Sequence, residues 1–156
     1  MARLAAYGIE LELPRGWYGR IYRRRGAAPT LHAGNFELPA DDADFGSGAL
    51  GRMPGGGMFI ALKEYQTGPE LRPGRGLYAP HSIPLPLQTR YFNPHALQVG
   101  RPGQAGYQHF FTAAGKRTFC LYAVLRGGAV AAPEHSEAQV RRLSGVLSSL
   151  KIEARQ

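Results

Sequence analysis

The sequence predicts one small α+β domain, a mostly antiparallel sheet of five to seven strands with a C-terminal helix packed on it. Three observations predict this fold class. Short apolar runs recur along the chain, bounded by glycine and proline, as in strands. Only residues 137–149 carry apolar side chains at helical spacing over several turns. The length of 156 residues suits a single domain, residues 1–156, which buries about two thirds of its unfolded surface.

The first two strands are expected near the N-terminus. Over residues 9–13 isoleucine and leucine alternate with glutamate, which is typical of a strand with one buried face. Pro14 and Gly16 break this pattern, and residues 17–22 resume as a second strand. We expect the two strands to form a hairpin that turns Trp17 and Ile21 into the core. Its outer face then carries Tyr18, Arg20 and Tyr22.

Three further strands follow from apolar runs. Residues 30–38 read as a strand with Leu31, Ala33 and Phe36 inward, and the acidic, then glycine-rich residues 40–57 read as a loop. The continuous apolar run at residues 58–62 predicts a strand covered on both faces. Residues 107–111 and 118–125 form the strongest predicted hairpin, near the sheet centre. Its three-residue loop, 113–115, places Gly115 in the left-handed conformation.

The C-terminal helix is the clearest predicted element. Ser136 and Gln139 have the spacing of a capping box, and an apolar stripe follows. Residues 151–153 are expected to return as a short strand. The stripe consists of Val140, Leu143, Leu147 and Leu150. Across the whole domain, the side chains expected to be largely buried are Trp17, Ile60, Phe119, Leu121, Leu143 and Leu147.

A Pro-rich segment, residues 68–106, separates the two halves of the predicted sheet. It holds seven prolines, and proline cannot donate a hydrogen bond within a sheet. We expect an edge strand at residues 87–92 and a short helical turn at residues 94–98. The segment is too apolar for a disordered one. Its apolar and aromatic side chains, among them Tyr78, Tyr91 and Phe92, therefore pack on the domain's own sheet, contact a partner, or roof a small-molecule pocket.

The net charge of +8 is compatible with several partners. Of the 19 basic residues 16 are arginine, which suits an acidic protein, a nucleic acid or a membrane surface, and which GC-rich coding sequence also produces. Cys120 is the only cysteine, so no intrachain disulfide forms. The first residues lack the apolar core of a signal peptide, and no run is long enough for a membrane span. We expect a cytoplasmic protein.

The motif search predicts no catalytic residue, no cofactor and no metal site. Gly46, Gly48 and Gly51 match the spacing of a dinucleotide-binding loop, but aspartates precede them and repel phosphate. The five histidines are scattered along the chain. Cys120 faces His109 if the hairpin loop has two or four residues, and faces Gln108 in the expected three-residue loop. We expect a structural core cysteine, and a protein that is not an enzyme.

The most informative local feature lies at residues 18–25. In a strand, alternate residues share one face, which here gathers aromatic and arginine side chains. Such a face suits base stacking with phosphate contact, or it is a solvated face on which arginine stacks on tyrosine. The candidate residues of this polyanion-binding face are Tyr18, Arg20, Tyr22, Arg24 and Arg25.

Both ends of the chain resemble the PsbP-like superfamily. The run GIELELPRGW at residues 8–17 resembles its opening strand and turn, and VLSSLKI at residues 146–152 resembles its closing helix and final strand. The resemblance implies an α-β-α sandwich, and because most members bind proteins it implies a protein partner and no catalytic motif. We expect a non-enzymatic protein-binding or assembly module that binds a partner protein or a copy of itself. The alternatives are a polyanion-binding domain and a small-ligand-binding protein or enzyme.

Overall fold

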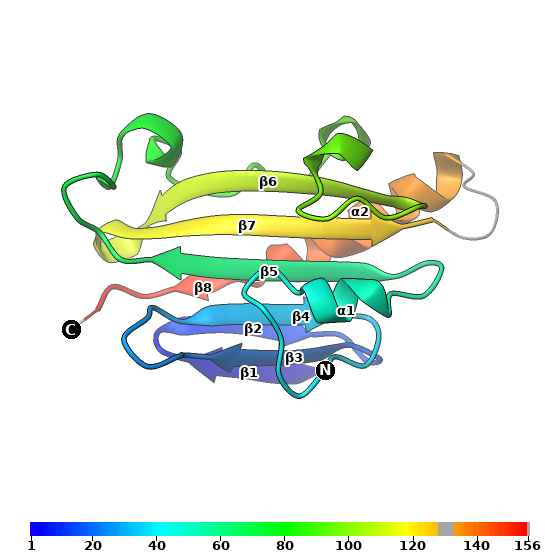
Figure 1. The fold of residues 1–156 in the computed structure, drawn as a ribbon, viewed down its shortest axis with the longest axis horizontal. Helices are drawn as coiled ribbons and strands as arrows, with labels where there is room; N and C mark the ends of the chain where they lie inside the picture. Colours follow the sequence, from blue (N-terminus) through cyan, green and yellow to red (C-terminus); the bar gives the residue numbers. More distant parts are fainter. Residues whose placement is uncertain (128–132, 156) are drawn as a thin grey trace.

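The computed structural model describes residues 1–127 and 133–155 as two antiparallel sheets and one long helix (Figure 1). The α+β class, the antiparallel pairing and the C-terminal helix are confirmed. In chain order the elements are β1 (Ala2–Ala6), β2 (Ile9–Leu13), β3 (Tyr18–Tyr22), β4 (Thr30–Gly34), α1 (Ser47–Gly51), β5 (Met58–Tyr65), β6 (Gln104–Ala113), β7 (Arg117–Arg126), α2 (Pro133–Leu147) and β8 (Lys151–Ile152). None of the helices in these residues is long and apolar enough to cross a membrane.

The strands form two sheets where one was predicted. One sheet has the order β3-β4-β5-β7-β6 and the other the order β1-β2-β8. The predicted hairpin of β2 with β3 is therefore wrong: the turn at Gly16, whose φ is 83°, carries the chain from one sheet to the other. Gly19 of β3 explains the close packing of the sheets, because a Cβ there would lie 2.9 Å from the Cδ1 of Leu13.

The five-stranded sheet has an inner and an outer face. The inner face packs on β1-β2-β8 and on α2, which lies behind the sheet in Figure 1. Ile60, Phe119, Leu121, Leu143 and Leu147 are buried there, as predicted, whereas Trp17 is only partly buried. The outer face is covered by residues 35–57, including α1, around a second core cluster. With one long helix and a second sheet, the described residues do not form the predicted α-β-α sandwich.

The β6–β7 hairpin forms with a shifted loop. β7 lies inside the sheet, as predicted, but β6 is an edge strand. Ala113 pairs with Arg117, so the loop is residues 114–116, with Gly115 at φ 70° and Lys116 at φ 59°. Moving the loop by one residue moves the register by two, and Cys120 therefore faces Phe110 and not Gln108. Arg117, the first residue of β7, forms a buried ion pair with Glu64 of β5.

Helix α2 begins earlier than predicted, at Pro133, because proline is well tolerated in the first turn of a helix. The side chain of Ser136, the expected cap, lies outside the described residues. The apolar stripe is confirmed: Val140 and Leu143 are buried against the inner face, and Arg141 points to solvent. The short final strand is also confirmed as β8, which pairs with β2.

The Pro-rich segment wraps around the edge of β6. It contains three short 3-10 helices, η1 (Gly76–Tyr78), η2 (Thr89–Tyr91) and η3 (Pro94–Ala96). The turn at η3 is confirmed, whereas the edge strand expected at residues 87–92 is wrong, because that stretch holds η2 and pairs only through the bridge of Asn93 with Gly106. Ile83 and Leu87 are buried in the inner core. The segment therefore packs largely on the domain's own sheet.

Candidate functional site

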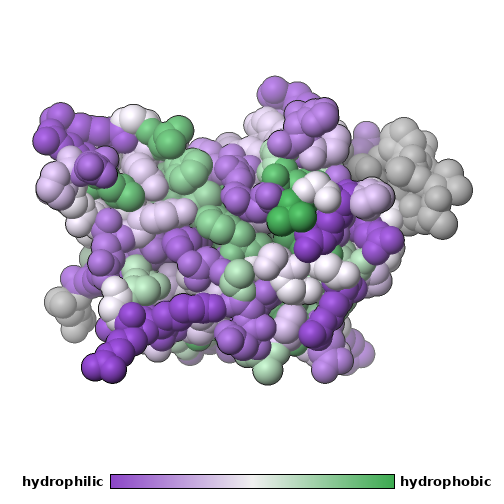
Figure 2. All heavy atoms as spheres, in the orientation of Figure 1, coloured by the Kyte–Doolittle hydropathy of each residue, from purple (hydrophilic) through white to green (hydrophobic). Residues whose placement is uncertain are grey.

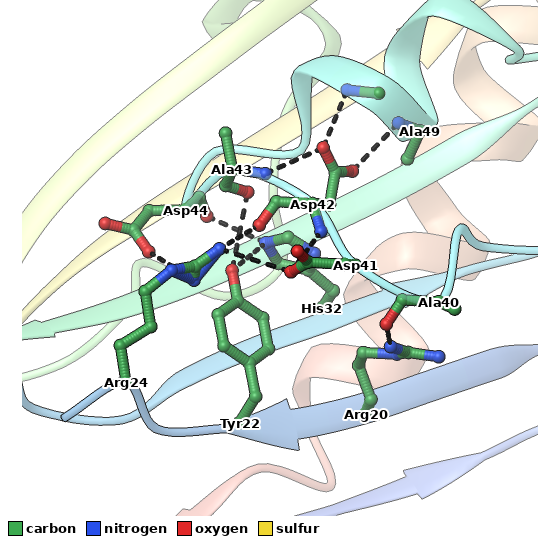
Figure 3. A network of polar contacts seen from close by, with 11 residues as sticks. Arg20, Tyr22, Arg24, His32, Ala40, Asp41, Asp42, Ala43, Asp44 and Ala49 are labelled. Carbon is green, nitrogen blue, oxygen red and sulfur yellow. Dashed lines mark hydrogen bonds and ion pairs between the residues drawn. The ribbon is translucent and has the colours of Figure 1, made fainter.

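The predicted tyrosine and arginine face of β3 is covered by the chain's own acidic segment, residues 40–44. Figure 3 shows this segment crossing the outer side of β3 and β4. The guanidinium of Arg20 donates to the carbonyl oxygen of Ala40, and that of Arg24 donates to the carbonyl oxygen of Asp42. The Arg24 guanidinium also lies 3.7 Å from the Asp44 carboxylate and 4.9 Å from the centre of the Tyr22 ring. Both cations are therefore engaged within the molecule.

A buried histidine ties the same segment to the sheet. Nε2 of His32 lies 2.8 Å from the carbonyl oxygen of Asp44 and 3.1 Å from the hydroxyl of Tyr22. Burial lowers the pKa of His32, and burial raises the pKa of Tyr22 to about 12. Both groups are therefore neutral near pH 7, and they act as hydrogen-bonding partners inside the covered face.

The carboxylate of Asp42 occupies the N-terminal end of α1. It accepts hydrogen bonds from the backbone of Gly48 at 2.7 Å and of Ala49 at 2.9 Å. Gly46, the residue before this helix, has φ 74°, and a Cβ there would lie 2.2 Å from the ring of Phe59. The spaced glycines therefore serve backbone geometry and close packing, and the chain's own carboxylate fills the place where a phosphate would bind.

The structure separates the five predicted residues of this face. Arg20, Tyr22 and Arg24 meet under the acidic segment, whereas Tyr18 and Arg25 remain exposed outside it. The sequence did not predict that the acidic segment covers this face, because contacts between residues about twenty positions apart leave no local pattern. The run of three aspartates among residues 41–44 is the one signal that pointed to it.

A second feature of the outer face is an aromatic strip, which we define as Phe45, Tyr65, Tyr78 and Phe110. Tyr78 contacts Phe110 edge to face with ring centres 5.5 Å apart, and Tyr65 at 6.4 Å. The strip lies between the acidic segment and the Pro-rich segment, and its side chains are partly exposed. Figure 2 shows hydrophobic side chains crossing the middle of this face over β6, β7 and β5, flanked by hydrophilic ones.

Cations border the aromatic strip. The Nζ of Lys63 lies 5.2 Å from the ring centre of Tyr65 and also pairs with Asp44. Arg75 sits one turn before Tyr78, whose backbone N–H donates to its carbonyl oxygen at 3.0 Å. Leu77, which lies between Arg75 and Tyr78 in the sequence, is 67% exposed. The sequence named Tyr78 but missed Tyr65 and Phe110, although their alternation with buried neighbours places them on one face of their strands.

Tyr91 and Phe92, the other predicted binding residues, pack on the inner face of the sheet, whereas Tyr78 lies on the outer face. The ring of Tyr91 stacks on that of Tyr107 with centres 5.3 Å apart, and Phe92 contacts the same ring at 5.9 Å. Both are partly buried against the inner core. They hold the Pro-rich segment on the sheet.

Cys120 and His109 do not form a catalytic pair. The register places Cys120 opposite Phe110 and His109 opposite Leu121, so the two side chains leave the sheet on opposite faces. Burial raises the pKa of the Cys120 thiol to about 12. Among residues 1–127 and 133–155, no group of three or more histidine, cysteine, aspartate or glutamate side chains could hold a metal ion.

Two small clefts adjoin the Pro-rich segment, the place where a small-molecule pocket was an alternative. One, of about 280 Å³, is lined by apolar residues including Ile83, Leu85 and Leu147. The other, of about 350 Å³, is lined by Phe92 and Gln104 among others.

Comparisons with protein-family models, with curated proteins and with solved structures found no match to this chain. The resemblance to the PsbP-like superfamily stays a prediction that rests on the two terminal runs.

Proposed function

We propose that the protein is a non-enzymatic module that binds a partner protein on the aromatic strip. The observation that carries this proposal is that the strip stays partly exposed beside residues 35–57, which cover the neighbouring part of the outer face. Contiguous apolar surface of this kind is uncommon on a protein that acts alone. Aromatic side chains are also enriched at the centres of protein interfaces.

The chemistry of the border favours an acidic partner. Arg72 and Arg75 precede the exposed Leu77 in the sequence and form no ion pair within the described residues. With a net charge of +8 on the chain, a partner segment that carries apolar side chains beside carboxylates matches this surface in polarity and charge. The resemblance to a superfamily whose members largely bind proteins supports the same class of partner.

Nucleic-acid binding through β3 is less well supported. Arg20 and Arg24, the phosphate-binding candidates of that face, already bond to carbonyl oxygens of the acidic segment. A nucleic acid would have to displace that segment, which is also held by His32 and by the Asp42 carboxylate at α1. We further propose a cytoplasmic setting, because a single buried cysteine suits a reducing compartment.

Two exposed leucines of the Pro-rich segment provide a matched test. Leu77→Glu places a carboxylate next to Tyr78 of the aromatic strip, whereas Leu85→Glu places one beside the inner-face cleft. Tagged wild type and both variants are purified from the native host under mild conditions, and bound proteins are compared by quantitative mass spectrometry. We expect at least one protein that wild type and Leu85→Glu retain and Leu77→Glu loses.

Thermal unfolding of both variants checks that each is folded. A set of bound proteins that Leu77→Glu leaves unchanged contradicts the proposal. If the chain is recovered alone, its mass is measured by light scattering. A doubled mass that Leu77→Glu reduces to that of a monomer would mean that the strip binds a second copy of the chain and not an acidic partner.

A further inference from the structure

A cleft lies where the ends of the two sheets meet, away from the aromatic strip. Its volume is about 450 Å³, within the range of sites for small ligands. Figure 1 shows this end of the molecule at the left, where the C-terminus is marked. Five separate segments form its walls, and the side chains used below are Tyr7, Arg23, Gln66, Arg117 and Arg155.

Arg117, which lines the cleft, belongs to a buried ion pair with an excess of positive charge. The carboxylate of Glu64 receives two hydrogen bonds from the Arg117 guanidinium, at 2.6 and 3.1 Å, and both side chains are at most 3% exposed. Arg155 lies 2.7 Å from the same carboxylate and is itself 57% exposed. One buried carboxylate is therefore shared by two guanidinium groups, and the second, which is exposed and lines the cleft, has further N–H donors.

A third guanidinium borders the cleft from another segment. Arg23, after β3, is exposed, and within the described residues it forms no ion pair. It lies 5.8 Å from the ring centre of Tyr7. Among the lining residues the one carboxylate is that of Glu153, which is exposed just after β8, and the Glu64 carboxylate lies buried behind Arg117. Three guanidinium groups against two carboxylates leave the cleft positively charged.

Tyr7 adds backbone strain at the same place. Its φ is 53°, in the left-handed region, which is unusual for a large aromatic residue. It forms the β1–β2 turn with Gly8, where asparagine or glycine is the common choice. A Cβ at Gly8 would lie 2.8 Å from the Nη1 of Arg117, so this turn packs directly on the buried ion pair. Strained residues of this kind gather at ligand sites.

We propose that this cleft binds a small anionic ligand through a phosphate or carboxylate group held between Arg23 and Arg155, with the Tyr7 ring against the ligand. Planar guanidinium groups bind both kinds of anion through paired hydrogen bonds. Gln66 provides a neutral amide donor on the remaining wall. This site shares none of the side chains of the aromatic strip, so it stands or falls independently of the proposed partner.

The test is an isothermal titration of the full chain with two probes, pyrophosphate and citrate, at low and at high salt. The phosphate and carboxylate probes distinguish the two ligand classes. Each of Arg23→Gln and Arg155→Gln should weaken binding of the favoured probe at least about tenfold, because each removes a charge-assisted hydrogen bond. Arg141→Gln is the matched control: it removes the same charge from an exposed position on α2.

Tyr7→Asn gives a second, opposite readout. Asparagine tolerates a positive φ, so this variant should unfold at a temperature about 2–4 °C higher, while its loss of the ring weakens probe binding. Arg117 is left unchanged, because breaking the buried ion pair threatens the fold. The proposal is overturned if neither probe binds at low salt, or if Arg141→Gln weakens binding as much as Arg155→Gln. The proposal is also overturned if the chain binds single-stranded DNA but neither probe, and if Arg23→Gln and Arg155→Gln do not weaken that DNA binding.

Discussion

His32 Nε2 lies 2.8 Å from the backbone carbonyl oxygen of Asp44 and is buried beneath the acidic segment. A carbonyl oxygen can only accept, so Nε2 carries the hydrogen and the neutral imidazole is the Nε2–H tautomer. Two neighbouring carboxylates, of Asp42 and Asp44, oppose the effect of burial on the pKa of His32, but burial is the larger influence. Burial therefore keeps the histidine that links β4 to the acidic segment uncharged near pH 7.

This link predicts a pH-dependent stability. The pKa of His32 in the folded protein lies below its ordinary value of 6.5, so the unfolded state binds more protons in this range. The contribution is complete above about pH 6.5, and it falls as the pH drops toward the folded-state pKa. Urea unfolding at pH 7.5 and 5.5 should show a lower free energy of unfolding at pH 5.5. In His32→Gln this difference should shrink, and an unchanged difference would contradict the assignment.

Asp42 is expected to stabilise α1 by capping its first backbone N–H groups. Asp42→Ala leaves those donors without the carboxylate and should lower the free energy of unfolding by about 0.5–2 kcal/mol. Asp41→Ala is the matched control, since the Asp41 side chain is 96% exposed, and an exposed ion pair contributes little. Chemical denaturation of both variants measures the difference. Equal losses would argue against the capping role.

Leu147 tests the packing of α2 on the inner face. It is buried in the main core, so Leu147→Ala should lower the free energy of unfolding by about 2–5 kcal/mol through lost contacts and a cavity. Arg141→Ala, on the exposed side of the same helix, should change it by less than about 0.5 kcal/mol. A small effect of Leu147→Ala would mean that the helix does not pack as described.

Cys120 should react slowly with thiol reagents in the native protein. The thiolate is the reactive form, and burial raises the pKa of this thiol to about 12, so little thiolate exists near pH 8. Because the chain has one cysteine, the labelled mass reports this site alone. We expect slow labelling in buffer and fast labelling in guanidinium chloride. Fast native labelling would reopen a nucleophilic role for Cys120.

Local patterns predicted most of the strands, but not β1 and not how the strands assemble. The apolar run of β5 and the stripe of α2 depend on neighbours in sequence, and both were predicted correctly. The division into two sheets depends on contacts such as Gly19 against Leu13, which no periodicity encodes. The buried ion pair of Arg117 with Glu64, which joins β7 to β5, is likewise a contact between distant residues that no local pattern encodes.

The same limit applies to the candidate sites. Alternation along β3 correctly placed Tyr18, Arg20 and Tyr22 on one face, because residues two apart share a side of a strand. That the acidic segment covers this face follows from the path of the chain, which brings Ala40 to Arg20. Of the aromatic strip only Tyr78 was predicted, since Tyr78 reaches Phe110 only after the Pro-rich segment turns back on β6.

The wrapping of β6 by the Pro-rich segment limits how this molecule can associate. Gly106 bonds outward to Asn93, and Thr112 bonds outward to Pro80, so both ends of the edge are occupied. Alternate residues of a strand point their amides the same way, which leaves Gln108 and Phe110 as the outward residues in between. Two residues are too few to template another strand. This edge therefore resists runaway strand-to-strand aggregation, and a protein seated on the neighbouring rings has to be recognised by its side chains.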